Sequence, residues 1–282
     1  SVRIRGFRDA VASLEEYRAS LELGFQVALR DVPGGRRAGR AAAGALAEGQ
    51  EGMPTGVVVF GSDLGLVGQF NEQIASFAAG RLRERDDPVR VAAVGNRLVP
   101  HLRSHGVEPA TVLPVAAGPS RLTALARELL LAVEEWRGEG VERVAVAHHA
   151  YRRGAAYGPR WQLLLPLDPD WLAELVDRPW PTRVIPTYRA PWETLFGFLV
   201  REYLHVSMVR AAAESQASEH AGRLAAMERA ESRIEEHAEQ LRQELRDRRQ
   251  EAITEELMDL MTGYRAVEEE EERRRGHRED RS

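Results

Sequence analysis

The clearest pattern of apolar and polar residues lies near the end of the chain, where small or apolar residues recur every three or four positions. That spacing is typical of one face of an α-helix. The pattern predicts one helix over residues 191–267, because Pro191 suits a first helical turn and no later Pro interrupts the run. At ~1.5 Å per residue such a helix is roughly 110 Å long, which is typical of a protein that transmits force or spans a partner. The positions are Met227, Ala230, Ile234, Ala238, Leu241, Leu245, Ile253, Leu257, Met261 and Tyr264.

A second helical pattern, with a seven-residue apolar repeat, opens the chain over residues 1–33. Arg18 interrupts the repeat and Tyr17 takes its apolar place, and the Pro-Gly-Gly at 33–35 ends the helix. Heptads predict a coiled coil, so we expect the two terminal helices to pair antiparallel, with everything between them inserted at one end. The repeat consists of Ile4, Phe7, Val11, Leu14, Leu21, Phe25 and Ala28.

The two predicted helices differ in length, and this difference also carries information. The shorter one covers at most half of the longer one, so the remainder must be exposed, pair elsewhere or match a segment that this sequence lacks. Because Ser1-Val2-Arg3 offers no helix cap, we expect the sequence to begin within a helix.

Between the helices, a Gly- and Ala-rich linker over 34–56 leads into an α/β domain over 57–190. Short apolar runs predict its strands, and faces of helical spacing between them predict helices. Strands that alternate with helices predict a mainly parallel, Rossmann-like sheet covered on both faces. A connection rich in Pro, from 179 to 191, returns the chain to the last helix. The predicted strands are 56–60, 89–94, 111–115, 141–147 and 161–167.

Composition excludes several kinds of chemistry. The chain has no Cys and all 39 of its basic residues are Arg, which excludes thiol nucleophiles, thiolate zinc sites, disulfides, a Walker-A lysine and a Schiff-base lysine. A net charge of −5 does not favour nucleic acid as a partner. No apolar run approaches the ~20 residues that a membrane-spanning helix needs.

Three places in the α/β domain suggest binding chemistry. The Gly-rich turn at 61–68 follows a strand and opens a helix, where phosphate loops lie, but it lacks the G-x-G-x-x-G spacing, so we favour a structural turn over nucleotide binding. His101 and His105 have a metal-binding spacing without a carboxylate at a matching position, which favours an ordinary surface helix. His148 and His149 alternate along a strand and point to opposite faces. We expect no catalytic group, cofactor or metal.

Three segments together resemble one family, the gamma subunit of F-type ATP synthase. Residues 62–71, Ser-Asp-Leu-Gly-Leu-Val-Gly-Gln-Phe-Asn, are similar to its S-D-x-G-L-C-G-x-x-N segment. Residues 218–230 are similar to its S-E-x-A-x-R-x-x-A-M-x-x-A signature, and residues 249–263 to its R-Q-x-x-I-T-x-E-L motif and the Gly that follows. Residues 161–167 also match a strand of its middle domain. The N-terminal repeat and the Pro-rich entry to the last helix look more like the divergent, sodium-pump-associated N-ATPase branch.

The resemblance implies a non-catalytic rotor shaft. Its coiled coil would stand inside a ring of three alpha and three beta subunits, and its α/β domain would rest with the epsilon subunit on a membrane ring of c subunits. It would couple proton or sodium flow to ATP synthesis or hydrolysis, as a peripheral subunit on the cytoplasmic side of the inner membrane. Two other functions stay open: a nucleotide-binding α/β enzyme on a dimerising coiled coil, and a scaffold without a rotary role.

The resemblance also assigns roles to residues. It implies head contacts at Arg249, Gln250, Thr254 and Glu256, helix packing at the stalk's foot by Glu219, Gly222, Arg223 and Met227, and a domain motif at Ser62, Asp63, Gly65, Gly68 and Asn71. Small residues around Gly222 would let a second helix approach closely, and Glu219 and Arg223 are spaced for an ion pair.

This chain departs from the family pattern at several positions. Arg246 stands where the family usually has Asn, and Val67 where it has Cys. Family members carry ~20 further N-terminal residues in the first helix, as estimated from the unpaired length of the last one. A charged tail over 268–282 extends beyond the usual end, and we expect it to be solvated and partly disordered.

Overall fold

The computed structural model describes residues 2–30, 53–84, 88–151, 157–181, 183–184 and 187–279, so most of the expected linker lies outside the described residues. It divides into two compact units, residues 1–226 and residues 227–282. The elements are α1 (Val2–Arg30), β1 (Thr55–Phe60), α3 (Phe70–Arg83), β2 (Val89–Val94), α4 (Val99–Ser104), β3 (Thr111–Leu113), a 3-10 turn (Pro119–Arg121), α5 (Leu122–Gly138), β4 (Arg143–Tyr151), β5 (Tyr157–Leu165), α6 (Pro169–Asp177) and α7 (Trp192–Glu279).

The centre of the first unit is a five-stranded sheet in the order β3-β2-β1-β4-β5. β1 pairs in parallel with β2 and β4, so that Val58 lies opposite Ala92 on one side and Val146 on the other. β3 is parallel to β2, and β5 runs antiparallel to β4 at the edge. Every residue of β1 is buried, which explains why its apolar run is continuous rather than alternating. The structure therefore confirms the predicted mainly parallel sheet.

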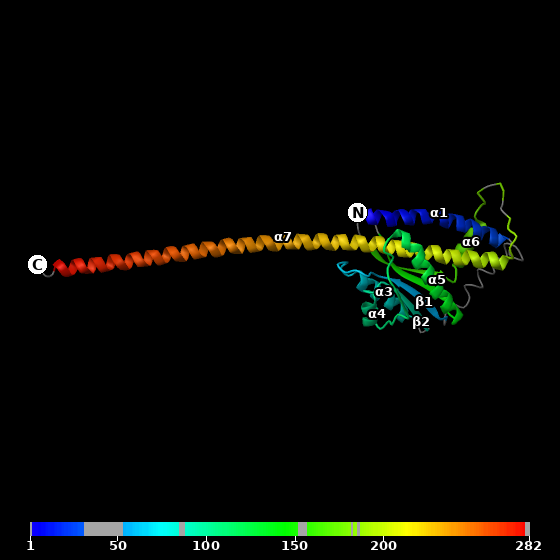
Figure 1. Ribbon diagram of the computed structural model, residues 1–282, viewed down its shortest axis with the longest axis horizontal. Coiled ribbons are helices and arrows are strands. Elements are labelled where there is room, and N and C mark those ends of the chain that lie inside the picture. The colour runs from blue at the N-terminus through cyan, green and yellow to red at the C-terminus, as the bar shows by residue number, and fades with distance from the viewer. Residues whose placement is uncertain are drawn as a thin grey trace. The chain divides into compact units, whose positions relative to one another are not determined.

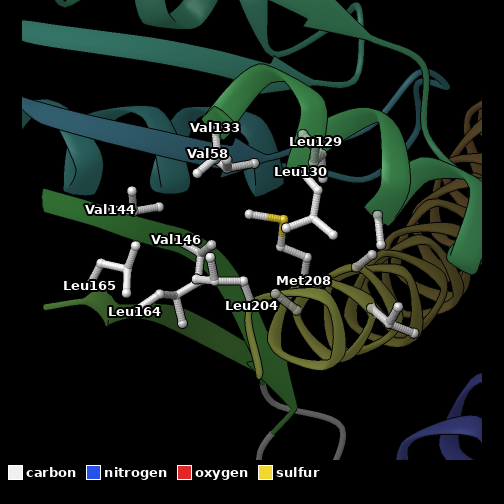
Figure 2. Packing of buried hydrophobic residues seen from close by; sticks show 14 of the residues in the cluster. Val58, Leu129, Leu130, Val133, Val144, Val146, Leu164, Leu165, Leu204 and Met208 are labelled. Atoms are coloured by element: carbon white, nitrogen blue, oxygen red, sulfur yellow. The ribbon is translucent and has the colours of Figure 1, made fainter. Parts of the chain in front are cut away.

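Helices cover both faces of this sheet (Figure 1). Val57 and Val59 of β1 face a core shared with α3 and α4, whereas Val58 and Phe60 face a larger core shared with α1, α5, α6 and α7. Figure 2 shows the larger core, in which Met208 of α7 lies among the side chains of α5, β4 and β5. Alternate residues of one strand thus hold helices on opposite sides.

Helix α1 packs antiparallel along the first part of α7 (Figure 1), as the heptads predict. The indole N–H of Trp192 donates to the carbonyl of Ala28 at 2.8 Å. Further along α7, the rings of Phe7 and His220 lie 5.7 Å apart between centroids. Residue numbers therefore fall along α1 as they rise along α7, which confirms the antiparallel pairing in this unit. The buried positions of the repeat are Phe7, Leu21, Phe25 and Ala28.

Tyr17 corrects one detail of the predicted repeat. Its side chain is 46% exposed instead of filling an apolar position, and its hydroxyl donates to Glu202 on α7 at 2.9 Å. A Tyr ring can lie along an apolar surface with its hydroxyl in water, so the heptad pattern alone does not decide its burial.

Several strand ends differ from the prediction by a few residues, and two helices differ more. Helix α6 lies in the segment where only a strand and a Pro-rich connection were expected, and the Asp168 carboxylate caps it by accepting from the backbone N–H of Asp170 at 2.9 Å. Helix α7 continues to Glu279, through most of the tail for which partial disorder was expected. Glu and Arg, which dominate that tail, are both strong helix formers.

Candidate functional site

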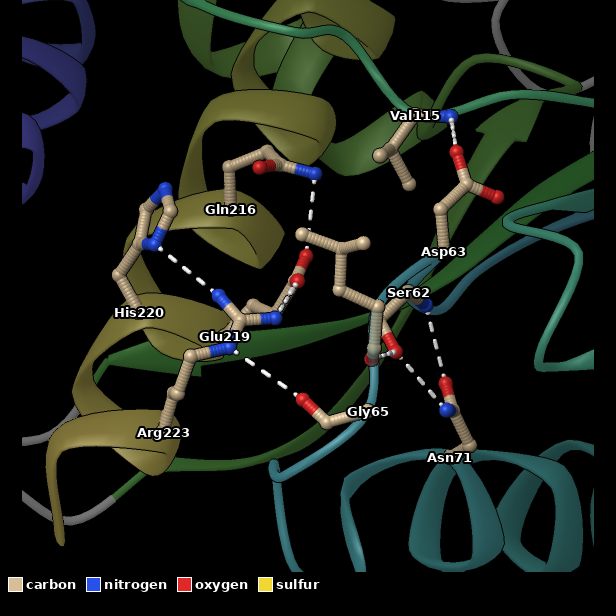
Figure 3. A network of polar contacts seen from close by, with 10 residues as sticks. Ser62, Asp63, Gly65, Asn71, Val115, Gln216, Glu219, His220 and Arg223 are labelled. Carbon is tan, nitrogen blue, oxygen red and sulfur yellow. Dashed lines mark hydrogen bonds and ion pairs between the residues drawn. The ribbon is translucent and has the colours of Figure 1, made fainter. Parts of the chain in front are cut away.

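The Gly-rich turn after β1 is closed by hydrogen bonds between its two ends (Figure 3). The backbone N–H of Ser62 donates to Asn71 Oδ1 at 2.9 Å, and Asn71 Nδ2 donates to Ser62 Oγ, also at 2.9 Å. Both side chains are buried. Because Asn71 lies in the first turn of α3, this pairing fixes where α3 begins relative to β1. The structure thus brings together two residues that the resemblance singles out.

Asp63 joins the loops that follow three adjacent strands. One carboxylate oxygen accepts from the backbone N–H of Asn96 at 2.6 Å and from its side-chain amide at 2.9 Å. The other accepts from the backbone N–H of Val115 at 2.9 Å. A phosphate at this edge of the sheet would need free N–H groups, and here a carboxylate already takes several of them. The arrangement therefore favours a structural turn over a nucleotide site.

The same turn contacts helix α7 at Gly65. The Gly65 carbonyl accepts from Arg223 Nε at 3.4 Å, which is a long hydrogen bond (Figure 3). Gly68 has φ of 62°, a left-handed conformation that a side chain would strain, so Gly is suited to the bend that leads into α3. The glycines of the motif thus shape a turn whose backbone Arg223 of α7 can contact.

Glu219 and Arg223 form an ion pair on α7 at this contact. Arg223 Nη2 lies 2.6 Å from Glu219 Oε1, and the two side chains are 16% and 3% exposed. Gln216 donates to the other carboxylate oxygen at 3.2 Å. Burial raises the pKa of Glu219, and the ion pair with Arg223 partly opposes this rise. The pair is therefore a buried connection between α7 and the turn, where removing one partner would leave the other charge uncompensated.

Gly222 lets α7 approach strand β5 closely. A Cβ placed on Gly222 would lie 2.8 Å from the Tyr157 ring, closer than real side chains come. The Tyr157 ring in turn packs against Phe70 and His149, with centroids 5.3 Å and 4.9 Å away. The sequence predicted a close approach of a second helix, whereas at Gly222 the structure shows a close approach of strand β5 and its aromatic cluster.

A partly buried polar network that the sequence pattern did not reveal also involves α7. Arg210 Nη1 lies 2.6 Å from Glu15 of α1, and Arg210 Nε donates to Glu214 at 2.7 Å. Glu214 also bonds to the buried His148 of β4 at 2.9 Å. Burial alone would raise the pKa of Glu214, but hydrogen bonds from His148 and Arg210 outweigh it and lower the pKa to about 2. The spacing of Arg210 and Glu214 suggests a pair, whereas the partners on α1 and β4 become visible only in the fold.

His149 lies on the opposite face of β4 from His148, as the strand alternation predicts. Its Nε2 is 2.9 Å from the carbonyl of Phe70, and its ring is fully buried. Burial lowers the pKa of His149 to about 4, with the Phe70 carbonyl opposing the change in part. His149 therefore serves as a neutral core residue at neutral pH.

Other predicted site residues lie in the second unit and are exposed. Arg249, Gln250, Thr254 and Glu256 all have exposed side chains, and the Thr254 hydroxyl donates to the Gln250 carbonyl at 2.8 Å. Met227 is 48% exposed, and its part in helix packing at the stalk's foot stays a prediction. The structure brings Glu219, Gly222 and Arg223 to the domain motif. The four exposed residues from Arg249 to Glu256 remain open to a partner.

His101 and His105 do meet a carboxylate, although none is close in sequence. Glu72 of α3 lies 2.8 Å from His101 Nδ1 through one oxygen and 2.8 Å from His105 Nε2 through the other. Among the residues that the structure describes, no group of His, Asp or Glu has an arrangement that could hold a metal ion. The helices in this described part of the chain include none that is long and apolar enough to cross a membrane.

Comparison with known proteins identifies the family. A family model described as ATP synthase matches residues 1–267, nearly the whole chain. The chain belongs to the ATP synthase gamma family. Relatives named ATP synthase gamma chain include that of Nautilia profundicola, 27% identical over 75% of this chain and 71% of its own, and that of Chromobacterium violaceum, 29% identical over 75% and 73%.

Solved structures show the same fold. The chain is similar to a chain of the Euglena gracilis mitochondrial ATP synthase assembly of OSCP, F1 and c-ring in rotational state 3, with a TM-score of 0.54 and 17% identity over 94% of each chain. A chain of the rotor from the same organism in rotational state 1 gives a TM-score of 0.52 and 15% identity, over 89% of this chain and 98% of that one. Family membership gives this chain the function of a gamma subunit, a non-catalytic central-stalk component of ATP synthase.

Proposed function

We propose that this gamma-family chain is a rotor shaft that couples proton or sodium flow through a c-ring to ATP synthesis or hydrolysis. The head would contain three alpha and three beta subunits surrounding residues 227–267. The α/β domain would rest with an epsilon subunit on the c-ring, at the cytoplasmic side of the inner membrane, as a peripheral part of the complex. Membership of the N-ATPase branch stays a prediction.

One observation carries this proposal: the second unit exposes an apolar stripe. Seven large apolar side chains that recur along α7 are each 55–69% exposed. Apolar surface of this extent marks a contact with another protein, and an isolated helix gains little stability without such a contact. An enclosing ring of subunits would cover the stripe. The residues are Ile234, Leu241, Leu245, Ile253, Leu257, Met261 and Tyr264.

The shaft would act through contacts that differ among the three beta subunits. Shifting a beta subunit from 1:99 to 99:1 between open and closed forms needs ~5.5 kcal/mol of differential binding. Charge-assisted hydrogen bonds contribute ~1.5–3 kcal/mol each, so a few of them supply much of this energy. Arg249, Gln250, Thr254 and Glu256 are exposed on α7 and are the groups we assign to these contacts.

The test compares two neighbouring arginines in the complete complex. Arg249→Ala should leave assembly with alpha and beta subunits intact but lower the number of ions pumped per ATP hydrolysed in membrane vesicles. Arg248→Ala, also exposed but rotated by ~100° around the helix, is the matched control and should leave this ratio unchanged. Unchanged coupling in Arg249→Ala would remove that residue from the proposed contact, and failure of the unaltered chain to copurify with the head would remove the rotor assignment.

A further inference from the structure

A cavity of about 390 Å³ lies between α5, α7 and the end of β5. This volume falls within the ~300–1,000 Å³ of small-molecule pockets. On each helix the lining residues recur every three or four positions, partly as adjacent pairs such as Val200 and Arg201, so they form one face. Figure 2 shows Leu130 and Val133 of α5, Leu165 of β5 and Leu204 of α7 on this side of the sheet. The apolar walls are formed by Leu130, Val133, Leu165, Phe196, Val200 and Leu204.

The polar groups of the cavity carry more positive than negative charge. Arg137, Arg201 and Glu134 line it together with the apolar walls. Arg201 pairs with Glu134 at 3.0 Å, and their side chains are 61% and 46% exposed. Within the described part of the chain, the Arg137 carbonyl accepts from the backbone N–H of Gly140, whereas its guanidinium makes no hydrogen bond or ion pair. One guanidinium is therefore free to bind an anionic group of a ligand.

Gly197 contributes open space to this cavity. It lies within α7 and lines the cavity, and a Cβ placed on it would meet no atom within 4 Å. Neither packing nor a left-handed backbone requires Gly at this position. Gly weakens a helix interior relative to Ala, so its local effect is to keep space open at a cost in helix stability.

We propose that this cavity binds an aliphatic carboxylate, with its hydrocarbon chain between α5 and α7 and its carboxylate at Arg137. Apolar walls suit the chain, and a planar guanidinium suits the two oxygens of a carboxylate. A bound molecule would bridge the α/β domain and the first part of α7. The site is separate from the domain motif and from the exposed stripe, so it does not rest on the proposed rotary role.

The experiment is calorimetric titration of the full chain with decanoate below its micelle concentration. Decanoate should bind about tenfold more tightly than decanol, which corresponds to one charge-assisted hydrogen bond. Arg137→Gln should remove this difference by weakening decanoate alone. Gly197→Leu should abolish the binding of both probes by filling the cavity. Gly80→Leu, placed in open space on α3, is the matched control and should bind like the unaltered chain.

Three results would overturn the proposal. The first is absence of decanoate binding to the full chain. The second is undiminished binding to a folded Gly197→Leu variant, or equal loss in the Gly80→Leu control, since either would place the ligand elsewhere. The third is equal affinity for decanoate and decanol. Arg137 is exposed and packs no core, so Arg137→Gln keeps the test decisive even if Gly197→Leu fails to fold.

Discussion

The two parts of helix α7 share one sequence pattern, but the apolar face is buried in the first part and exposed in the second. Between residues 192 and 226, apolar and small side chains such as Met208 and Ala213 are fully buried against α1 and the sheet. From residue 227 onward, side chains with the same spacing, such as Leu257, are mostly exposed. The spacing determines which face of a helix is apolar, but only the fold decides whether the chain covers that face itself.

Charged residues differ between the two parts in the same way. Arg210, Glu214 and Arg223 connect α7 to other elements, and Glu219 pairs with Arg223 on α7. All four side chains are partly or fully buried. In the second unit, the ion pairs of Glu239 join residues within the same helix and are about 60% exposed. Buried pairs fix positions, whereas exposed pairs contribute little to stability.

The largest expected difference in stability comes from making a Leu→Ala substitution in each part of α7. Leu204→Ala should lower the free energy of unfolding by about 2–5 kcal/mol, because Leu204 is buried in the larger core. Leu257→Ala should change it by less than about 0.5 kcal/mol, since Leu257 is exposed. Urea unfolding followed by circular dichroism measures both. Equal losses would mean that the second part is packed in the free chain.

The next largest effect is a loss of stability at acidic pH, which should arise in the first unit. Burial holds the pKa of His149 at about 4, below its ordinary value of 6.5, so the unfolded chain binds more protons between these values. Stability should therefore fall by about 3 kcal/mol as pH drops from 6.5 to 4. His149→Gln should flatten this part of the profile, whereas the exposed His237→Gln should not.

Protonation of Glu214 should extend the loss of stability to lower pH. Its pKa of about 2 lies below the ordinary 4.5, so its stabilising effect is present above pH 4.5 and disappears as pH falls towards 2. Chemical denaturation at a series of pH values resolves the two windows. A flat profile between pH 6.5 and 4 in the unaltered chain would contradict the burial of His149.

A Gly→Ala substitution should have a smaller effect on stability, and the direction of that effect should be opposite in the two parts of α7. Gly222→Ala should destabilise the chain by about 1–3 kcal/mol, because its Cβ would press on the Tyr157 ring. Gly263→Ala meets no atom within 4 Å and should stabilise its helix by up to ~1 kcal/mol. Thermal unfolding of both variants measures the difference. A stabilising Gly222→Ala would show that α7 does not approach β5 so closely.

The smallest effect is expected for an exposed ion pair. Glu239→Gln removes contacts to Arg242 and Arg246, at 3.2 Å and 3.0 Å, in a fully solvated setting. We expect no measurable change in Tm at physiological salt, because solvent and salt screen such pairs. A clear fall in Tm would show that exposed pairs hold the second part together.

Sequence patterns predicted the sheet and the paired helices because both depend on local periodicity. The run from Gly56 to Phe60 has the continuous apolar character of a central parallel strand, and the heptads mark the face of α1. Helix α6 was missed because its short run lies in a Pro-rich segment where no longer pattern stands out.

The candidate site was predictable only in part. The resemblance named Ser62, Asn71 and Gly222, and the fold brings them to the contact between the domain and α7. The partners Tyr157 and His148 were not predicted, because they are distant in sequence and no periodicity links them to α7. Tertiary partners of this kind follow from packing, which no single segment encodes.

The most direct test of the rotor account is to watch the α/β domain while the head hydrolyses ATP. The chain has no Cys, so Ser104→Cys on exposed α4 offers one labelling position in this subunit for a rotation probe. In a complex with immobilised alpha and beta subunits, we predict stepwise rotation of the probe in one direction, dependent on ATP. A probe that stays still while the complex hydrolyses ATP would contradict the account.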